Sequence, residues 1–506
     1  MTQVLMRDSK VPYPKFERRR APTSRQFDAR ASHARPTERA TERAHTTTGN
    51  ATTGNAATHS MIRGAFATTT KKMTATSASS TVNVRRVTLT TRGTKTARRV
   101  GASVVPRSTA DAMSSPAYDA SAHEPLRSGL EGKALNAKTR TFPSMQEVLK
   151  NIPQECFVRD TGKSMAYAVV STALTLGCGA LAYAFLPLQA AYWPLWVAYA
   201  FVTGTVATGC WVVAHECGHG AFSDNKTLQD TVGYILHSLL LVPYFSWQRS
   251  HAVHHSRTNH VLEGETHVPA RLGTEDANVV FKLRSLLGEG PFTALNLLGV
   301  FAFGWPVYLL TGASGGPVRG TTNHFLPFMG EQGKNALFPG KWAKKVWQSD
   351  IGVVAVLGAL AAWAAHSGIA TVMALYVGPY MITNFWLVLY TWLQHTDVDV
   401  PHFEGDEWNL VKGAFMTIDR PYGPVFDFLH HRIGSTHVAH HVNHTIPHYH
   451  AKKATEALAS AYPDLYLYDP TPIATATWRV GSKCIAVVKK GDEWVFTDHE
   501  LTPATA

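Results

Sequence analysis

The apolar residues of this 506-residue chain are gathered into a few long runs. Five runs come near the ~20 residues that a helix needs to cross a bilayer, and several carry no charge. They cover 165–186, 194–214, 291–310, 351–365 and 369–393, and a shorter run covers 232–245. Buried helices of a large soluble protein are the alternative. Because uncharged runs of this length recur, the pattern favours an all-α integral membrane protein.

Residues 1–115 differ from the rest in composition. The chain holds 48 Lys and Arg against 36 Asp and Glu, but residues 1–110 account for 21 of the former and 5 of the latter. No acidic residue lies between Glu42 and Asp111, where Arg, Ser, Thr and Ala dominate. Such a segment cannot build a core and is typical of an organellar transit peptide. A disordered tail, or a start at Met61, is the alternative. The positive charge lies in this leader, which argues against a nucleic-acid-binding face.

This distribution divides the chain into four parts. We expect a disordered leader over 1–115, a short segment over 116–160, a membrane domain over 161–470 and a C-terminal tail over 471–506. The five cysteines contain no CxxC pair, so a disulfide framework or a thiolate zinc site is not indicated.

Three histidine clusters follow the apolar runs. The first contains His215 and His219, which lie four residues apart and therefore share one face of a helix. The other two have the spacing H-x-x-H-H, which predicts three ring nitrogens aimed at a common point. They are His251, His254 and His255, and His437, His440 and His441.

Eight histidines at ligand spacing suit two metal ions. Taken alone, the first cluster is also the HExxH pattern of zinc proteases, with Glu216 as general base. A zinc protease needs only two histidines, one further ligand and a water, so it would leave most of these residues unused. A metal transporter is a third interpretation. It would require polar groups inside the membrane spans, and these runs are almost free of charge. Imidazole binds iron, copper and zinc, so the ligands do not name the metal.

The clusters also constrain the topology, because ligands of one site must lie on one side of the bilayer. The run over 232–245 is too short to cross, so the first two clusters share a face. The runs over 351–365 and 369–393 then form a hairpin that returns the third cluster to that face. We therefore expect four membrane spans in two hairpins, with 291–310 as an interfacial or re-entrant helix and a histidine-rich domain on one face.

At this point the sequence resembles the membrane fatty acid desaturases, whose three histidine boxes have the forms HxxxH, HxxHH and HxxHH. The resemblance covers roughly residues 145–470 and includes the flanks HECGHGAFSD, SWQRSHAVHHSRTNH, WLQHTDVDVPHF and THVAHHVNHTIPHYHAKKAT. The last segment is similar to that of plant-type enzymes that act toward the methyl end of the acyl chain. The retained His437 and the lack of an HPGG heme motif separate the chain from the front-end desaturases.

The resemblance implies an O2-dependent oxidoreductase with a non-heme di-iron centre. The implied ligands are the eight clustered histidines and His395, which stands where the family places a further ligand after the last span. The resemblance leaves a hydrogen-bonding His395 at the helix end as an alternative. Glu216 is expected to orient a ligating imidazole. Electrons would come from an external donor, which is ferredoxin in a plastid or cytochrome b5 in the endoplasmic reticulum; the leader favours a plastid membrane.

The position of the new double bond is predicted as delta-12 (omega-6). Glu216 in the first box resembles the omega-6 enzymes, whereas the following Gly220 is seen in omega-3 boxes. An omega-3 desaturase or a related acyl hydroxylase is therefore the alternative. Integral placement in the membrane favours a lipid-linked acyl substrate.

Overall fold

The computed structural model describes residues 141–499. The predicted leader over 1–115, and most of the segment predicted over 116–160, lie outside these described residues. The described chain is mainly helical, with two short two-stranded sheets. Its helices are α1 Met145–Lys150, α2 Thr161–Phe185, α3 Trp193–His219, α4 Lys226–Leu239, α5 Tyr244–Ser256, α6 Glu275–Leu287, α7 Glu289–Thr311, α8 Lys341–Ser367, α9 Ile369–Val372, α10 Gly378–His395, α11 Leu410–Phe415, α12 Pro424–Leu429, α13 His437–Val442, α14 His448–Ala461 and α15 Ile473–Lys483.

Five helices among the described residues are long and apolar enough to cross a membrane. They are Thr161–Phe185, Ala190–His219, Glu289–Thr311, Lys341–Ser367 and Ile369–His395, the last of which joins α9 and α10 through a π-helical turn at Met373–Val377. They coincide with the five long runs expected from the sequence, which confirms the all-helical fold class.

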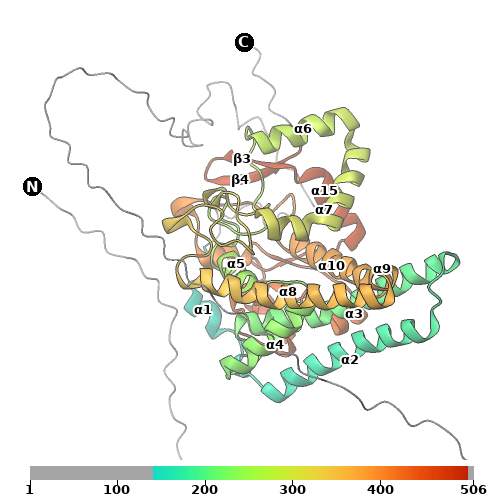
Figure 1. Ribbon diagram of the computed structural model, residues 1–506. Coiled ribbons are helices and arrows are strands. Elements are labelled where there is room, and N and C mark those ends of the chain that lie inside the picture. The colour runs from blue at the N-terminus through green and yellow to red at the C-terminus, as the bar shows by residue number, and fades with distance from the viewer. Residues whose placement is uncertain (1–140, 500–506) are drawn as a thin grey trace, which may run out of the picture. The chain divides into compact units, whose positions relative to one another are not determined.

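Helices α2 and α3 form one hairpin, and α8 with α9–α10 forms another (Figure 1). The turns of both hairpins lie at the same end in Figure 1, and the Tyr199 hydroxyl donates to the carbonyl of Leu375 there, 2.9 Å away. Helix α3 packs against α2, α4 and α10. The two hairpins therefore run side by side, and the ends that carry His219 and His395 lie at the opposite end from the turns.

Helix α7 makes polar contacts with other described elements at both of its ends. Near its start, Glu289 pairs with Arg284 at 3.0 Å and with Lys483 at 3.3 Å. Near its end, the Tyr308 hydroxyl donates to Glu265, 2.9 Å away. The sequence analysis expected this helix to be interfacial or re-entrant, but α7 is one of the five described helices that are long and apolar enough to cross a bilayer.

A core of aromatic and aliphatic side chains supports the histidine clusters. Trp211 of α3, Trp247 of α5, Trp305 of α7 and Leu387 of α10 are all buried in this core. A second core forms where Val438, Ala439 and Val442 of α13 pack against α1, α11 and α14. Since the apolar residues of α13 face this second core, its histidines face the other way, toward α3 and α5.

Two small sheets complete the described fold. Strands β1 (Ile418–Asp419) and β2 (Leu467–Tyr468) pair in parallel, with Ile418 opposite Leu467. Strands β3 (Ala486–Lys490) and β4 (Glu493–Thr497) form an antiparallel hairpin. The hairpin and α15 belong to the segment that the sequence left as a tail over 471–506, and here they are ordered elements packed on the rest of the chain.

Candidate metal centre

The first histidine cluster lies at the last turn of α3. Gly220 follows His219 with a φ of 77°, a left-handed conformation that glycine adopts readily and that ends the helix. His215 and His219 are one turn apart, and their Nε2 atoms lie 3.2 Å from each other. The Nε2 atom of His251, on α5, lies 3.0 Å from that of His215. Thus the first two clusters meet although 31 residues separate them in the chain.

All nine histidines predicted as ligands come together. Within each of two groups, the nitrogens that could bind a metal lie within 4.8 Å of one another. Group one contains His215, His219, His251, His255 and His440, and group two contains His254, His395 and His441. The ninth, His437, places its Nε2 atom 2.9 Å from that of His395, beside group two.

The way the clusters divide between the two groups differs from the sequence expectation. Each H-x-x-H-H cluster was expected to aim at one point, but His251 and His255 belong to group one while His254 belongs to group two. A helix turns about 100° per residue, so His254 and His255 point in directions about 100° apart. Each such cluster therefore contributes to both groups, as His440 and His441 also do.

The spacing of the nitrogens fits metal coordination. Metal–nitrogen bonds of about 2.0–2.1 Å place neighbouring ligand nitrogens of an octahedron or tetrahedron roughly 2.9–3.4 Å apart. Five Nε2 pairs among the nine histidines are separated by 2.9–3.2 Å. Among the described residues, the Nε2 atoms of His440 and His441 are buried without a hydrogen-bond partner. The donor set therefore fits two metal ions.

The buried environment keeps these imidazoles neutral, which metal binding requires. Burial lowers the pKa of His251, His255 and His440 well below the usual range, and nearby histidines lower it further. Burial also lowers the pKa of His254, to about 4. The histidine rings are therefore uncharged nitrogen donors. If they were protonated, rings this close together would repel one another.

Several groups that the sequence analysis did not identify hold the ligand rings in place. The Nδ1 atom of His254 lies 2.7 Å from the carbonyl of Glu265 and 2.9 Å from the hydroxyl of Thr266. The Nδ1 atom of His441 lies 3.0 Å from the hydroxyl of Thr258. Such contacts fix the orientation of a ring and direct its other nitrogen at the metal. Thr258 lies three residues after His255 in the sequence. This closeness to the second cluster is the one signal that could have suggested its contact with a ligand ring.

A buried carboxylate positions the third cluster. Asp419 accepts the backbone N–H of His437 at 2.5 Å and that of Val438 at 3.0 Å, and it accepts the hydroxyl of Tyr466 at 2.9 Å. Burial raises the pKa of Asp419 to about 6, in spite of these hydrogen bonds. The start of α13 is thereby tied to β1.

Glu216 lies near the Nδ1 edge of the His215 ring, between this ring and His448. Its carboxylate is 3.6 Å from Nδ1 of His215, and it accepts the backbone N–H of His448 at 2.9 Å. The metal-facing atom of His215 is Nε2, on the opposite edge of the ring. This placement suits a residue that orients His215 and does not suit the general base of a zinc protease, which must face the metal-bound water.

Other histidines of the described residues lie outside both groups. His237 packs on Trp247 with ring centroids 4.8 Å apart, and His324 lies 2.9 Å from the Ser250 hydroxyl. His267, 2.8 Å from the Thr391 hydroxyl, is also outside. The same holds for His260, His366, His402, His430, His431 and His499. His444 is closer, with its ring 4.7 Å from that of His219.

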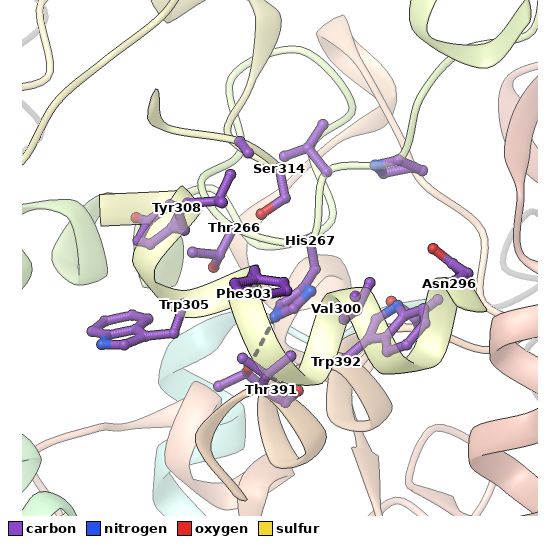
Figure 2. A pocket seen from close by; sticks show the side chains of 18 of the residues that line it. Thr266, His267, Asn296, Val300, Phe303, Trp305, Tyr308, Ser314, Thr391 and Trp392 are labelled. Atoms are coloured by element: carbon purple, nitrogen blue, oxygen red, sulfur yellow. Dashed lines mark hydrogen bonds between the residues drawn. The ribbon is translucent and has the colours of Figure 1, made fainter. Parts of the chain in front are cut away.

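A cavity of about 670 Å³ leads to the metal centre. Its wall includes Trp247, His251 and His254 at the metal centre, and it continues along α7 past Tyr308 and Phe303. His267 and Thr391 both line the cavity, and Figure 2 shows them joined by their hydrogen bond. The lining is mostly apolar, and the volume is in the ~300–1,000 Å³ range of ligand sites.

Comparison with known proteins agrees with this site. The sequence model of the family described as fatty acid desaturase matches residues 190–471. A Delta(12) fatty acid desaturase of Mortierella alpina is 38% identical over 373 residues, which are 70% of this chain and 90% of that protein. A Delta(12)-fatty-acid desaturase of Arabidopsis thaliana is 39% identical over 69% of this chain and 91% of that protein. An omega-6 fatty acid desaturase, endoplasmic reticulum, of Brassica juncea is 40% identical over 72% and 93%. This chain therefore belongs to the fatty acid desaturase family.

Proposed function

We propose that this protein introduces a cis double bond at the delta-12 (omega-6) position of a lipid-linked acyl chain. Membership in the family makes it an O2-dependent oxidoreductase of the membrane that acts on fatty acyl chains. The assignment of the delta-12 (omega-6) position is supported by relatives of 38–40% identity that are named delta-12 or omega-6 desaturases. The observation that carries the chemistry is the pair of buried histidine groups at the end of an apolar cavity.

We propose iron as the metal, held by His215, His219, His251, His255 and His440 in group one and by His254, His395, His437 and His441 in group two. A methylene C–H bond has no acidic proton, so acid and base groups alone cannot break it. Iron would supply the redox chemistry: one hydrogen leaves each of two adjacent carbons, two electrons come from an outside donor, two protons come from solvent, and O2 becomes two waters.

The side chains of this protein position the substrate and exclude water. The apolar wall formed by Val300, Phe303 and Leu387 orients a saturated chain along α7, and Trp247 packs beside His251 at the metal end. The Nδ1 contacts of His254 and His441 leave their Nε2 atoms directed at the metal. A rigid, dry site of this kind protects a reactive oxidant from side reactions.

A lipid-linked substrate is supported by the surface around the cavity. Leu283 of α6 and Leu295 and Phe303 of α7 line the cavity and are 45%, 56% and 63% exposed. An apolar rim of this kind is compatible with hydrocarbon and unfavourable in water. An acyl chain can then enter from the membrane while its headgroup stays at the interface.

The test is expression in yeast with fatty acid analysis by gas chromatography. Delta-12 action gives a new diene from oleoyl chains, whereas a triene formed only after linoleate feeding would indicate omega-3 action. Hydroxylated product would indicate the related hydroxylase activity. In the variant His254→Ala, we expect no product and normal membrane content of the protein. The matched control is His366→Ala, which removes an exposed imidazole on α8 far from the ligand groups and should retain activity.

We further propose a plastid membrane as the location and ferredoxin as the electron donor. The support is the acid-free, Arg- and Ser-rich composition of residues 43–110. The Brassica juncea relative carries endoplasmic reticulum in its name, and cytochrome b5 is the donor expected there. A fusion of residues 1–115 to a fluorescent protein in plant cells separates the two locations. Turnover of purified protein with reduced ferredoxin or with reduced cytochrome b5 separates the two donors.

A further inference from the structure

A second, much smaller cavity lies beside the metal centre, apart from the acyl cavity of about 670 Å³. Its volume is about 10 Å³, close to the ~10–15 Å³ that one water molecule needs. His254 and His395, both of ligand group two, form part of its wall. Among its lining residues, only Gly264 and Val268 lack a polar side chain. This space, which we call the polar chamber, therefore suits water better than hydrocarbon.

His402 presents an unpartnered polar atom at the polar chamber. Among the described residues, its Nδ1 atom is buried without a hydrogen-bond partner, and its side chain lines the chamber. His402 is 2% exposed and belongs to neither ligand group. A buried ring nitrogen without a hydrogen bond is unfavourable, and proteins commonly satisfy such an atom with a buried water where there is room. The polar chamber provides that room.

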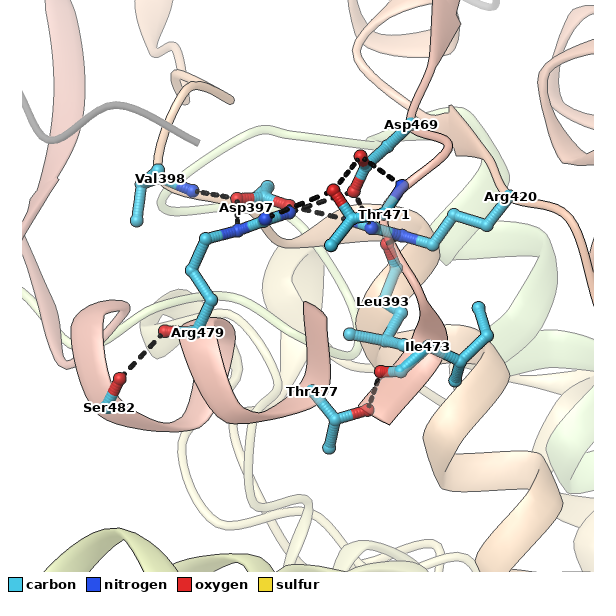
Figure 3. Close-up of polar contacts among 10 residues, drawn as sticks. All are labelled: Leu393, Asp397, Val398, Arg420, Asp469, Thr471, Ile473, Thr477, Arg479 and Ser482. Atoms are coloured by element: carbon cyan, nitrogen blue, oxygen red, sulfur yellow. Dashed lines mark hydrogen bonds and ion pairs between the residues drawn. The ribbon is translucent and has the colours of Figure 1, made fainter. Parts of the chain in front are cut away.

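The loop that carries His402 is fixed at both of its ends. It begins at an ion cluster of two carboxylates and two guanidinium groups, which are those of Asp397, Asp469, Arg420 and Arg479 (Figure 3). Arg479 donates to Asp397 at 2.6 Å and to Asp469 at 2.8 Å. At the other end of the loop, the backbone of His402 exchanges hydrogen bonds of 2.8 and 2.9 Å with Trp494 of β4. The His402 ring is therefore held in place at the wall of the chamber.

A strained turn separates the polar chamber from the acyl cavity. Thr266, His267 and Val268 line both spaces. Thr266 and His267 have φ values of 58° and 52°, a left-handed conformation that is rare for residues other than glycine and rarest for β-branched ones such as threonine. The Thr266 hydroxyl lies 2.9 Å from Nδ1 of His254, and Nε2 of His267 lies 2.8 Å from the Thr391 hydroxyl. Strain of this kind persists where surrounding contacts enforce it, commonly at functional sites. Here the strained turn keeps a polar space apart from an apolar one.

The polar chamber also adjoins the surface of the protein. Arg257 and His260 line both the chamber and an open cleft, whose wall includes Glu263, Trp408 and Lys489. The side chain of Arg257 is 43% exposed and pairs with Glu263 at 2.8 Å. Arg257 and His260 therefore stand between the chamber and solvent.

We propose that the polar chamber holds water that exchanges with solvent past Arg257 and His260, so that protons reach the metal centre and product water leaves it without crossing the acyl cavity. This inference rests on the proposed desaturase function, which consumes protons from solvent and releases water. The acyl cavity is mostly apolar, and a charge that crossed it would lose its hydration. In this arrangement His402 is a positioning residue, because its Nδ1 atom holds the water in a chamber that His395 also lines.

The first test needs no variant. A crystallographic or cryo-EM density map of the purified wild-type protein should show a water about 2.7–3.2 Å from Nδ1 of His402. The map of His402→Phe, whose ring is of similar size but forms no such hydrogen bond, should lack this water. A wild-type map that resolves other buried waters but none at His402 would overturn the proposal.

The second test measures proton delivery. In His402→Phe with normal iron content, we expect diene formation to fall by about 100-fold, the lower end of what proton transfer by a positioned group contributes. The fall should be larger in D2O than in water because proton delivery then limits turnover, whereas a merely structural defect lowers both rates equally. His402→Gln keeps a polar group at the chamber and should restore much of the activity.

The matched control is His237→Phe, which changes an equally buried histidine that lines neither the acyl cavity nor the polar chamber. Its ratio of rates in water and in D2O should equal that of the wild type. The same unchanged ratio in His402→Phe would overturn the proposal, while diene formation by the wild type would still support the desaturase function.

Discussion

The hydroxyl of Thr258 controls the orientation of a predicted ligand, and its removal has a calculable effect. Thr258 is buried, its hydroxyl donates to the carbonyl of His254 at 2.7 Å, and it can therefore accept the Nδ1–H of His441 at 3.0 Å. Thr258→Val keeps the shape and leaves that N–H without a partner. A buried unsatisfied polar group costs about 1–3 kcal/mol. Loss of such a ring contact typically weakens metal binding by 10–100-fold, or about 1.4–2.8 kcal/mol.

We expect the Thr258→Val protein to remain folded and to lose iron at chelator concentrations 10–100-fold lower than the wild type. Iron content after titration with a chelator is measured by mass spectrometry, and diene formation is measured alongside. The matched control is Thr231→Val, which makes the same change at an exposed position of α4. Iron affinity within twofold of the wild type would refute the assignment of Thr258 as the residue that holds His441.

Three other outcomes follow from the structure. Arg479→Met breaks a buried ion pair and should lower the free energy of unfolding by about 3–5 kcal/mol, as measured by thermal denaturation. Lys452→Met, which breaks an exposed pair of 3.7 Å, should lower it by less than about 1 kcal/mol. Equal losses of stability in the two variants would contradict this expectation. Removal of metal by a chelator should lower the Tm, because metal at 100 times its Kd stabilises the fold by about 2.7 kcal/mol; an unchanged Tm would argue against a structural role of the centre. Burial lowers the pKa of His324 to about 3. Between pH 6.5 and 3 this side chain therefore gains a proton only in the unfolded chain. Its contribution lowers the free energy of unfolding by about 1.4 kcal/mol for each pH unit as the pH drops through this window. His324→Asn should reduce that slope, and an identical slope would contradict the assignment.

The sequence predicted the features that repeat at helical spacing. His215 and His219 share a face because four residues make about one turn, and the apolar runs marked the helices that carry them. The family resemblance pointed to His395, whose Nε2 atom lies 3.1 Å from that of His254. Local periodicity and ligand chemistry suffice for conclusions of this kind.

The sequence did not reveal how the two ligand groups divide the clusters or what surrounds them. His254 and His255 are neighbours in the chain, yet they face different groups, because this depends on how α5 is rotated against α3 and α13. The cavity is lined both by Trp211 and by Phe496, 285 positions later in the chain, and a shared lining of this kind leaves no periodic signal. Tertiary packing alone decides these features.

The ion cluster around Arg479 has a practical consequence for anyone who shortens the protein. A chain cut at residue 471, where the family match ends, would keep Asp397, Arg420 and Asp469 but lose the second guanidinium that neutralises them. Two carboxylates would then share one arginine in a water-poor interior, next to the helix end that carries His395. We therefore expect such a truncated protein to misfold, so the boundary of the recognisable family does not coincide with the boundary of the smallest stable unit.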